Sequence, residues 1–337
     1  MTNDLNKKQF TVPTLAHDQR LDLFLLSHTE QHSRSAIQRD IKAGRVDVDG
    51  RCITVAKHKV QADQRITWQP TEQPSETWQA FEMPIEVLYE DDHICVLNKP
   101  SGLTMHPGAG TGQTTLANGL LAYDPNRSTL TRAGIVHRLD KNTSGCCVTA
   151  KTDMAQLRLT ANIRDRQVHR EYVALVHGRV DLPHFVEANI GRHSKRRTAM
   201  AVVANGRYAR TDFQPILHYP QHTLLHLRLM TGRTHQIRVH MAHINHPIVG
   251  DTCYGQHRQA GALYTDMAKR LLGEFPHQAL HAARLSFNHP ISDEALTFKA
   301  PLEDTFQTLL SHMSEAIEHK CSDDLDWLWQ YPTHQAE

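Results

Sequence analysis

The chain has 337 residues, of which 39% are hydrophobic and 22% charged, and its formal net charge is +1. This composition is typical of a globular protein with two or three domains, and the near-neutral charge means that any nucleic-acid-binding surface must be local. The six cysteines contain no Cys-x-x-Cys pair, which argues against a zinc ribbon. The polar N-terminus and the lack of a long apolar run predict a cytoplasmic protein without membrane contact. We also expect a monomer.

The first part of the sequence predicts a short arm followed by a small α/β domain. Residues 1–17 are expected to form a mobile arm. Residues 18–68 should contain two helices, because apolar residues recur at helical spacing over 21–28 and again at Ile37 and Ile41. An alternating strand with an Asp-Gly hairpin turn follows them.

The outer side of the second of these helices is basic. On its own, such a pattern also fits an ordinary solvated helix face. However, a helix, a basic helix and a strand with an Asp-Gly turn together resemble the S4 domain, a small RNA-binding module, over about residues 18–66. The resemblance implies RNA contacts by Arg34, Arg39, Lys42 and Arg45.

A change in composition separates this domain from the rest of the chain. Residues 69–83 carry two prolines among polar residues, with a third at Pro84, and are expected to form a linker. Residues 84–315 should form a second domain, and 316–337 an acidic, tryptophan-rich tail whose role the sequence does not explain. Within the second domain, strands and helices follow without a βαβ rhythm, which predicts an α+β fold rather than a doubly wound parallel sheet. Adjacent Cys146 and Cys147 should lie on a strand and point to opposite faces.

Histidine is abundant, at 25 residues, so a metal site needs to be considered. The densest cluster lies on a helix expected to begin near Thr234 and to end before Pro247. No Cys, Asp or Glu completes a familiar metal-binding pattern there until Asp251. We therefore expect neither a metal nor a cofactor. The histidines of the cluster are His235, His240, His243 and His246.

The segment "GIVHRLDKNTSG" at 134–145 places one aspartate, Asp140, in a tightly specified run. A lone aspartate in a loop usually marks a turn or a helix cap. The run "HRLDKNTSG", however, resembles the signature of the RluA family of pseudouridine synthases. Further motifs in that family's usual order extend the resemblance over about residues 84–310: "LNKPSGLTMHPGAG", "REYVALVHG", "TGRTHQIRVHMAHINHPIVGD" and "QALHAARLSFNHP".

The resemblance implies a fold and a reaction. The fold is α+β, with a long, largely antiparallel mixed sheet flanked by helices and loops. The reaction converts a uridine in RNA to pseudouridine: the N1–C1′ bond breaks, the base turns over, and C5 bonds to C1′. The resemblance assigns Asp140 to the sugar, where a carboxylate can attack C1′, stabilise positive charge there, or take a proton from C2′. The sequence does not choose among these routes.

Four other residues receive roles from the resemblance. Arg233 is expected to pair with Asp140, and Tyr172 to stack on the uracil and relay a proton, since a phenol is a poor base at neutral pH. A surface arginine and a half-buried strand tyrosine are the ordinary alternatives. Arg138 is expected to fill the space left by the flipped base, and His137 to support this loop and the bound RNA.

A second basic segment, "GRHSKRRTAM", is expected to grip phosphates, although a solvated loop is the ordinary alternative. Its basic residues are Arg192, Lys195, Arg196 and Arg197. The sequence is most like the branch of the family whose members act on the large ribosomal subunit, so we expect 23S rRNA as the partner. A tRNA substrate and a non-catalytic RNA-binding assembly factor remain alternatives.

Overall fold

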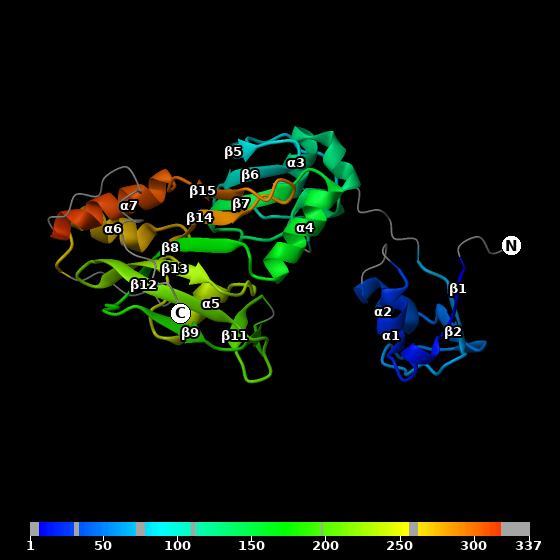
Figure 1. Ribbon diagram of the computed structural model, residues 1–337. Helices are drawn as coiled ribbons and strands as arrows, with labels where there is room; N and C mark the ends of the chain where they lie inside the picture. Colours follow the sequence, from blue (N-terminus) through cyan, green and yellow to red (C-terminus); the bar gives the residue numbers. More distant parts are fainter. Residues whose placement is uncertain are drawn as a thin grey trace. The chain divides into compact units, whose positions relative to one another are not determined.

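The computed structural model describes residues 7–29, 34–71, 78–108, 112, 114–196, 198–255 and 262–317. The chain divides into two compact units, Met1–Thr77 and Trp78–Glu337 (Figure 1). Across the described ranges no helix is long and apolar enough to cross a membrane.

The first unit packs two helices against a four-stranded sheet with the order β1-β4-β2-β3. The buried side chains Leu21, Phe24, Ile37, Ile41 and Trp68 lie in one hydrophobic cluster, as the helical spacing predicted for the helices. The elements are β1 (Lys8–Thr11), the short 3-10 helix η2 (Thr14–Ala16), α1 (Leu21–Ser27), α2 (Arg34–Lys42), β2 (Val46–Val48), β3 (Arg51–Cys52) and β4 (Arg65–Trp68).

The predicted mobile arm is wrong from Lys8 onward. β1 pairs antiparallel with β4, from Lys8 opposite Trp68 to Thr11 opposite Arg65. Val12 is fully buried in the core of the unit. The sheet thus gains an edge strand whose backbone groups are paired. Residues 1–6 lie outside the described ranges.

The second unit is built on a mixed sheet of nine strands with the order β5-β6-β7-β14-β8-β13-β12-β9, and β15 pairs with β14. Every pairing is antiparallel except that of β7 with β14. The predicted α+β class with a largely antiparallel sheet is therefore confirmed. The strands of this sheet are β5 (Glu86–Glu90), β6 (Ile94–Lys99), β7 (Ser144–Ala150), β8 (His169–His177), β9 (His184–Glu187), β12 (Arg210–His218), β13 (His222–Leu229), β14 (Leu280–Asn288) and β15 (Ala295–Lys299).

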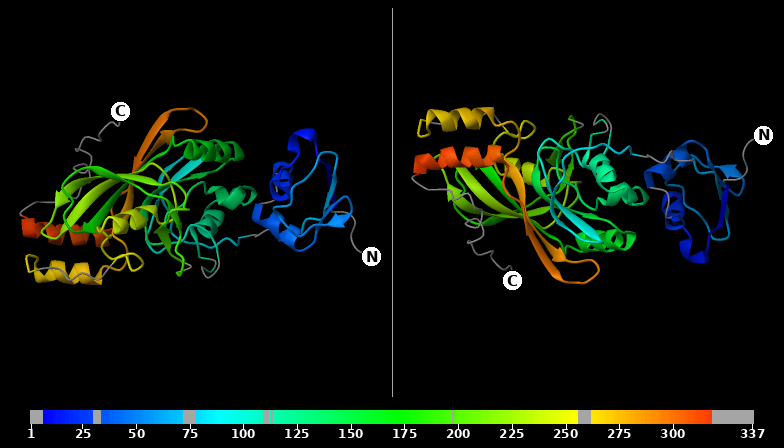
Figure 2. Two further views of the ribbon diagram at one scale, coloured as in Figure 1. Left: turned by 90° about the horizontal axis from the view of Figure 1, so that it is seen from below. Right: turned by 90° about the horizontal axis from the view of Figure 1, so that it is seen from above.

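Helices cover both faces of this sheet. In Figure 2, α3, α6 and α7 lie on one side and α4 lies on the other. Cys147 belongs to the larger hydrophobic cluster, whereas Cys146 packs with Ala155 and Leu159 of α4, so the predicted opposite orientation of the two cysteines is confirmed. The helices are α3 (Leu116–Tyr123), α4 (Asp153–Arg164), α5 (Gln236–His243), α6 (Asp266–Glu274) and α7 (Asp304–Ser314), and the 3-10 helices are η3 (Pro125–Thr129), η4 (Thr131–Gly134) and η5 (Glu315–Ile317).

A separate two-stranded hairpin, β10 (Ile190–Arg192) and β11 (Met200–Val202), carries the basic segment between its strands. Of the predicted linker, residues 69–71 belong to the first unit and residues 78–83 to the second. There the Asn118 side chain donates a hydrogen bond to the Gln79 carbonyl at 2.7 Å, and the Phe81 N–H donates to the Asn118 carbonyl at 3.0 Å. Of the predicted tail, residues 318–337 lie outside the described ranges.

Candidate active site

The Asp140 loop connects η4 to β7, and contacts between the start of β7 and β14 fix its position. The Thr143 N–H donates to the Asp140 carbonyl at 3.0 Å and closes a turn directly after Asp140. Ser144 is hydrogen-bonded to His281 of β14 at 2.9 Å. Gly145 has a φ of +107°, and a Cβ there would collide with the backbone of Ala282. Only glycine therefore permits the close parallel pairing of β7 with β14 that positions the loop.

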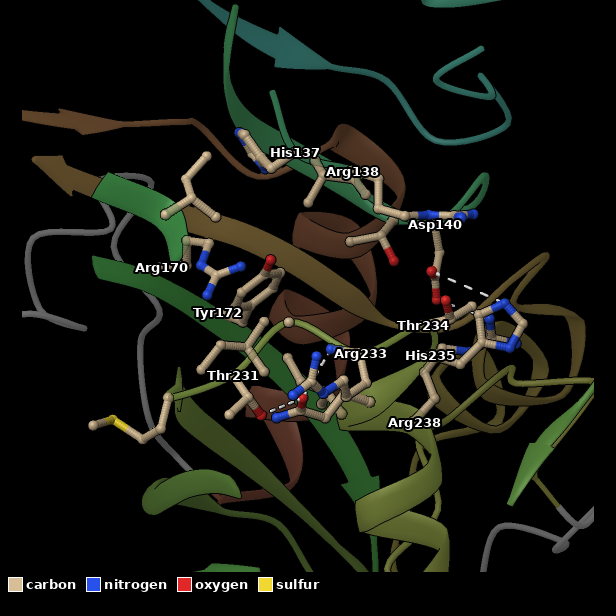
Figure 3. Close-up of a pocket in the computed structure, with 18 of the residues that line it drawn as sticks. His137, Arg138, Asp140, Arg170, Tyr172, Thr231, Arg233, Thr234, His235 and Arg238 are labelled. Atoms are coloured by element: carbon tan, nitrogen blue, oxygen red, sulfur yellow. Dashed lines mark hydrogen bonds and ion pairs between the residues drawn. The ribbon is translucent and has the colours of Figure 1, made fainter. Parts of the chain in front are cut away.

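The loop forms one wall of a cavity of about 460 Å³. β8 contributes Arg170 and Tyr172 to the lining, and the segment from Leu229 to Arg238 closes the remaining side (Figure 3). Arg138, His137 and Arg233 also line the cavity. The structure thus brings the catalytic residues predicted from the sequence into one place.

Asp140 is paired with Arg238, so the predicted pairing with Arg233 is wrong. Arg238 donates from Nη1 to Asp140 Oδ2 at 3.0 Å and, from its other side, to both carboxylate oxygens of Asp251 at 2.7 and 3.0 Å. Asp251 is itself buried and also accepts the backbone N–H groups of Cys253 and Tyr254. Burial alone would lower the pKa of Arg238, but Asp251 and Asp140 raise it above its ordinary value. The guanidinium is therefore a fixed positive charge that orients Asp140.

Arg233 instead stays at the turn before α5. Its side-chain Nε donates to the Tyr208 carbonyl at 3.0 Å, and its backbone N–H donates to Gln236 Oε1 at 3.0 Å. Burial and the neighbouring Arg207 and Arg166 lower the pKa of its guanidinium. Within the described ranges Arg233 makes no ion pair with a carboxylate, so its side chain is a cation of the cavity wall.

Sequence reasoning considered His235 only as a possible metal ligand. Its backbone is left-handed, with φ 56° and ψ 23°, and its Nε2 lies 4.0 Å from Asp140 Oδ1. Its Nδ1 is hydrogen-bonded to the Tyr254 hydroxyl at 2.7 Å. Burial lowers the pKa of His235, Asp140 opposes this effect, and Arg238 and Arg138 reinforce it. The imidazole is thus favoured as a neutral neighbour of the carboxylate.

The histidine cluster does not converge on one point. His240 contacts Thr211 and the Ala188 carbonyl, and His246 contacts the His177 carbonyl. Over the part of the chain that the structure describes, no three His, Cys, Asp or Glu side chains are placed to share a metal ion.

Tyr172 is 5% exposed, and burial raises its pKa to about 12. Its phenol therefore remains protonated at neutral pH, which favours stacking over direct general-base action. Arg138 is exposed and Leu139 is buried. His137 accepts the Val148 N–H at its Nε2, at 3.0 Å, and burial together with Arg170 lowers its pKa to about 3. His137 thus supports the loop as a neutral side chain.

The predicted RNA-gripping residues lie outside the cavity. Arg39, Lys42 and Arg45 are exposed, whereas Arg34 pairs with the buried Asp22 at 3.0 Å. In the hairpin, Arg192 at the end of β10 and Lys195 and Arg196 of the loop are exposed, and Arg196 also donates to the Cys253 carbonyl at 3.0 Å. Arg197 lies outside the described ranges.

Comparison with known proteins identifies the family of the chain and its two domains. Residues 93–243 match the family described as RNA pseudouridylate synthase, and residues 19–66 match the S4 domain. Two solved structures, Human RNA Pseudouridylate Synthase Domain Containing 4 and Domain Containing 1, share the fold at 24% identity. Their TM-scores are 0.52 and 0.53, covering 69% and 73% of this chain and 93% and 94% of theirs.

Curated relatives are more similar. Ribosomal large subunit pseudouridine synthase D of Vibrio parahaemolyticus is 43% identical over 300 residues, covering 89% of this chain and 92% of the relative. The protein of the same name from Salmonella typhimurium is 42% identical over 311 residues, covering 92% and 95%. Identity at this level over most of both chains shows that this chain belongs to the RluA-type pseudouridine synthases, the enzymes that isomerise uridine to pseudouridine in RNA.

Proposed function

We propose that this enzyme isomerises uridines of 23S rRNA, with Asp140 acting at the ribose of a flipped-out nucleotide. The observation that carries the assignment of Asp140 is its position: it is the one carboxylate among the described residues lining the cavity, and Arg238 holds it by Oδ2 alone. The names of the relatives support the large ribosomal subunit as the source of the RNA. Such a substrate also supports the expected cytoplasmic location.

The pairing leaves Asp140 Oδ1 available for chemistry. His235 Nε2 lies 4.0 Å from Oδ1, a separation longer than a hydrogen bond. Oδ1 can attack C1′ as the N1–C1′ bond breaks, or take the proton from C2′ to form a glycal. Both routes need the carboxylate in its ionised form. The overall reaction conserves the composition of the nucleotide, so no co-substrate has to supply or remove a group.

Tyr172 and Arg138 act on the base and its place in the RNA stack, not on the sugar. The target must leave the RNA stack to reach Asp140, and the exposed Arg138 can take its place with a planar cation. Inside the cavity, the neutral Tyr172 ring offers a face for the detached uracil. When C5 has bonded to C1′, the C5 proton is lost, and the phenol relays it rather than accepting it as a pre-formed base.

Grip on the RNA comes from exposed cations of both units. The α2 residues Arg39, Lys42 and Arg45 and the hairpin residues Arg192, Lys195 and Arg196 supply contacts to phosphates. These contacts are independent of sequence, so they add affinity without choosing the uridine.

The decisive experiment is release of tritium from a 23S rRNA transcript labelled at uridine C5, with wild type beside Asp140→Ala. Formation of the C5–C1′ bond expels that hydrogen, so we expect release by wild type and none by Asp140→Ala. Wild-type release from a tRNA transcript but not from 23S rRNA or assembled subunits would overturn the proposed substrate.

A second variant separates chemistry from binding. Asp140→Asn keeps the shape of the side chain and removes its charge, so we expect turnover to be lost while RNA affinity stays within a few fold of wild type. Filter binding of the same transcript gives the affinity. Retained turnover would refute the role of Asp140.

A further inference from the structure

The cavity holds more positive charge than its carboxylate can balance. Among its described lining residues there are six arginines and one acidic residue, Asp140. Arg238 is paired with Asp140 and Asp251, and Arg164 with Asp165 at 2.9 Å. The other four make no ion pair with a carboxylate within the described ranges: Arg138, Arg166, Arg170 and Arg233.

These four arginines differ in depth. Arg138 and Arg166 are exposed, which suits contact with the phosphates of RNA outside the cavity. Arg170 is half-buried on β8, and its Nε is buried with no hydrogen-bond partner among the described residues. An unsatisfied buried donor costs about 1–3 kcal/mol, and more when it is charged. A half-buried guanidinium in this state is therefore suited to an acceptor that arrives with the substrate.

Arg170 is placed beside the residue that faces the base. It precedes Tyr172 by two residues on the same strand, so both side chains lie on one face of β8. Figure 3 shows them on one wall of the cavity, with Asp140, His235 and Arg238 at the other. Its charge opposes the rise in the pKa of Tyr172 that burial causes.

We propose that Arg170 is a further catalytic residue, which binds a carbonyl oxygen of the target uracil and stabilises the negative charge that the base carries when it leaves C1′. The inference rests on the proposed action of Asp140 at the sugar. The N1–C1′ bond breaks with its electron pair going to N1, and the charge spreads to O2 and O4. A fixed guanidinium there lowers the barrier to cleavage, as preorganised donors do for other developing anions. After C5 has bonded to C1′, the proton lost from C5 is matched by one gained at N1.

Gly232 offers a way to move Arg170 without removing it. A Cβ at position 232 would lie 2.6 Å from Arg170 Nη1, the end of a flexible side chain. Gly232→Ala should therefore displace the guanidinium while keeping the charge of the cavity. Arg170→Met removes the charge and keeps a side chain of similar length. Arg270→Met is the control, because it removes a charge from the exposed surface of α6, away from the cavity.

The test compares two leaving groups in single-turnover reactions, using 23S rRNA transcripts made with uridine or with 5-fluorouridine, and measures loss of the parent nucleoside. Fluorine makes the departing base a more stable anion, so it needs the guanidinium less. We expect Arg170→Met to slow uridine cleavage about 100-fold and 5-fluorouridine cleavage by a distinctly smaller factor. Gly232→Ala should show the same inequality more weakly, and Arg270→Met should match wild type.

Three results would overturn the inference. Wild-type rates in Arg170→Met would show that the guanidinium is not used. Equal slowing of both nucleosides would show that it does not act on leaving-group charge. A weaker affinity with a shallower salt dependence and an unchanged single-turnover rate would mean that Arg170 binds a phosphate. Failure of wild type itself to cleave uridine would instead count against the proposed substrate, so the two failures are distinguishable.

Discussion

The two units of this chain use positive charge in different ways. In the first, Arg39, Lys42 and Arg45 of α2 and the turn that follows it are exposed, and the buried acidic residues are Asp22 and Asp40. In the second, arginines extend from the surface into a cavity, and the deepest, Arg238, is 8% exposed. Exposed cations add affinity that salt weakens, whereas buried ones act on a particular group at short range. The first unit is thus suited to holding RNA and the second to changing it.

The largest effect should come from Arg238→Met. The change leaves the buried Asp251 without its ion pair and Asp140 without its orienting group, so turnover should be lost and the free energy of unfolding should fall by about 3–5 kcal/mol. Urea unfolding and tritium release measure the two effects.

Arg210→Met is the matched control for this variant. Arg210 pairs with Asp212 at 2.7 Å, but both side chains are about a third exposed (31% and 28%). Loss of that pair should cost about 0–1 kcal/mol. Similar losses for the two variants would contradict the distinction between buried and exposed charge.

A smaller effect is expected when Arg39, Lys42 and Arg45 are all replaced by glutamine in the full chain. RNA affinity should fall, and the slope of log affinity against log salt should become shallower by about 2–3, since each phosphate contact contributes roughly 0.7–0.9. Turnover at saturating RNA should remain at the wild-type value.

The control for α2 removes three positive charges elsewhere, by replacing Arg179, Lys269 and Arg270 with glutamine. Each of these is paired with an acidic neighbour in the structure. An equal change of slope in both triple variants would mean that only net charge matters and that the first unit has no particular grip on RNA.

The sequence could predict which segments meet but not which arginine serves Asp140. Arg233 and Arg238 belong to one motif, five residues apart, and the choice between them depends on where α5 begins and how it meets the Asp140 loop. Asp251 was the one sequence feature that could have pointed to Arg238. In the structure, its carboxylate binds the Arg238 guanidinium and orients it toward the Asp140 loop. The sequence could not predict a role for Arg170 either, because that role is inferred from a buried Nε that has no hydrogen-bond partner among the described residues.

Short edge elements were also beyond sequence reasoning. β1 has four residues, too few for a periodic pattern, and it exists because β4 supplies partners for its backbone. In contrast, Cys146 and Cys147 were placed correctly, because two buried layers on one strand impose opposite orientations on neighbouring residues.

The two units should also differ in their response to acid. His222 and His281 of the second unit are buried, and burial lowers the pKa of each, to about 3 and about 4. The unfolded state therefore binds more protons than the folded one once the pH falls below about 6.5. The second unit should lose stability from there downward, by at most about 1.4 kcal/mol per pH unit for each histidine.

Asp22 gives the first unit a dependence of the same sign but in a lower pH range. Burial raises its pKa, but hydrogen bonds from Arg20, Gln38 and Arg34 outweigh this and hold the pKa below its ordinary value of 3.8. Its contribution is therefore present above pH 3.8 and is lost only as the pH falls further. Urea unfolding followed by pulsed hydrogen exchange, with peptides assigned to each unit, should show the second unit weakening first. Parallel loss in both units would contradict this order.

The left-handed backbone of His235 has a consequence for engineering. A residue other than glycine in this conformation costs about 1 kcal/mol, and here it stands next to the carboxylate proposed to do the chemistry. A library selected only for heat resistance should accept glycine or asparagine at position 235. Such variants would withstand higher temperatures but would lack the imidazole between Tyr254 and Asp140. Thermal stability and turnover therefore favour different residues at position 235, and selection for heat resistance alone should lower turnover.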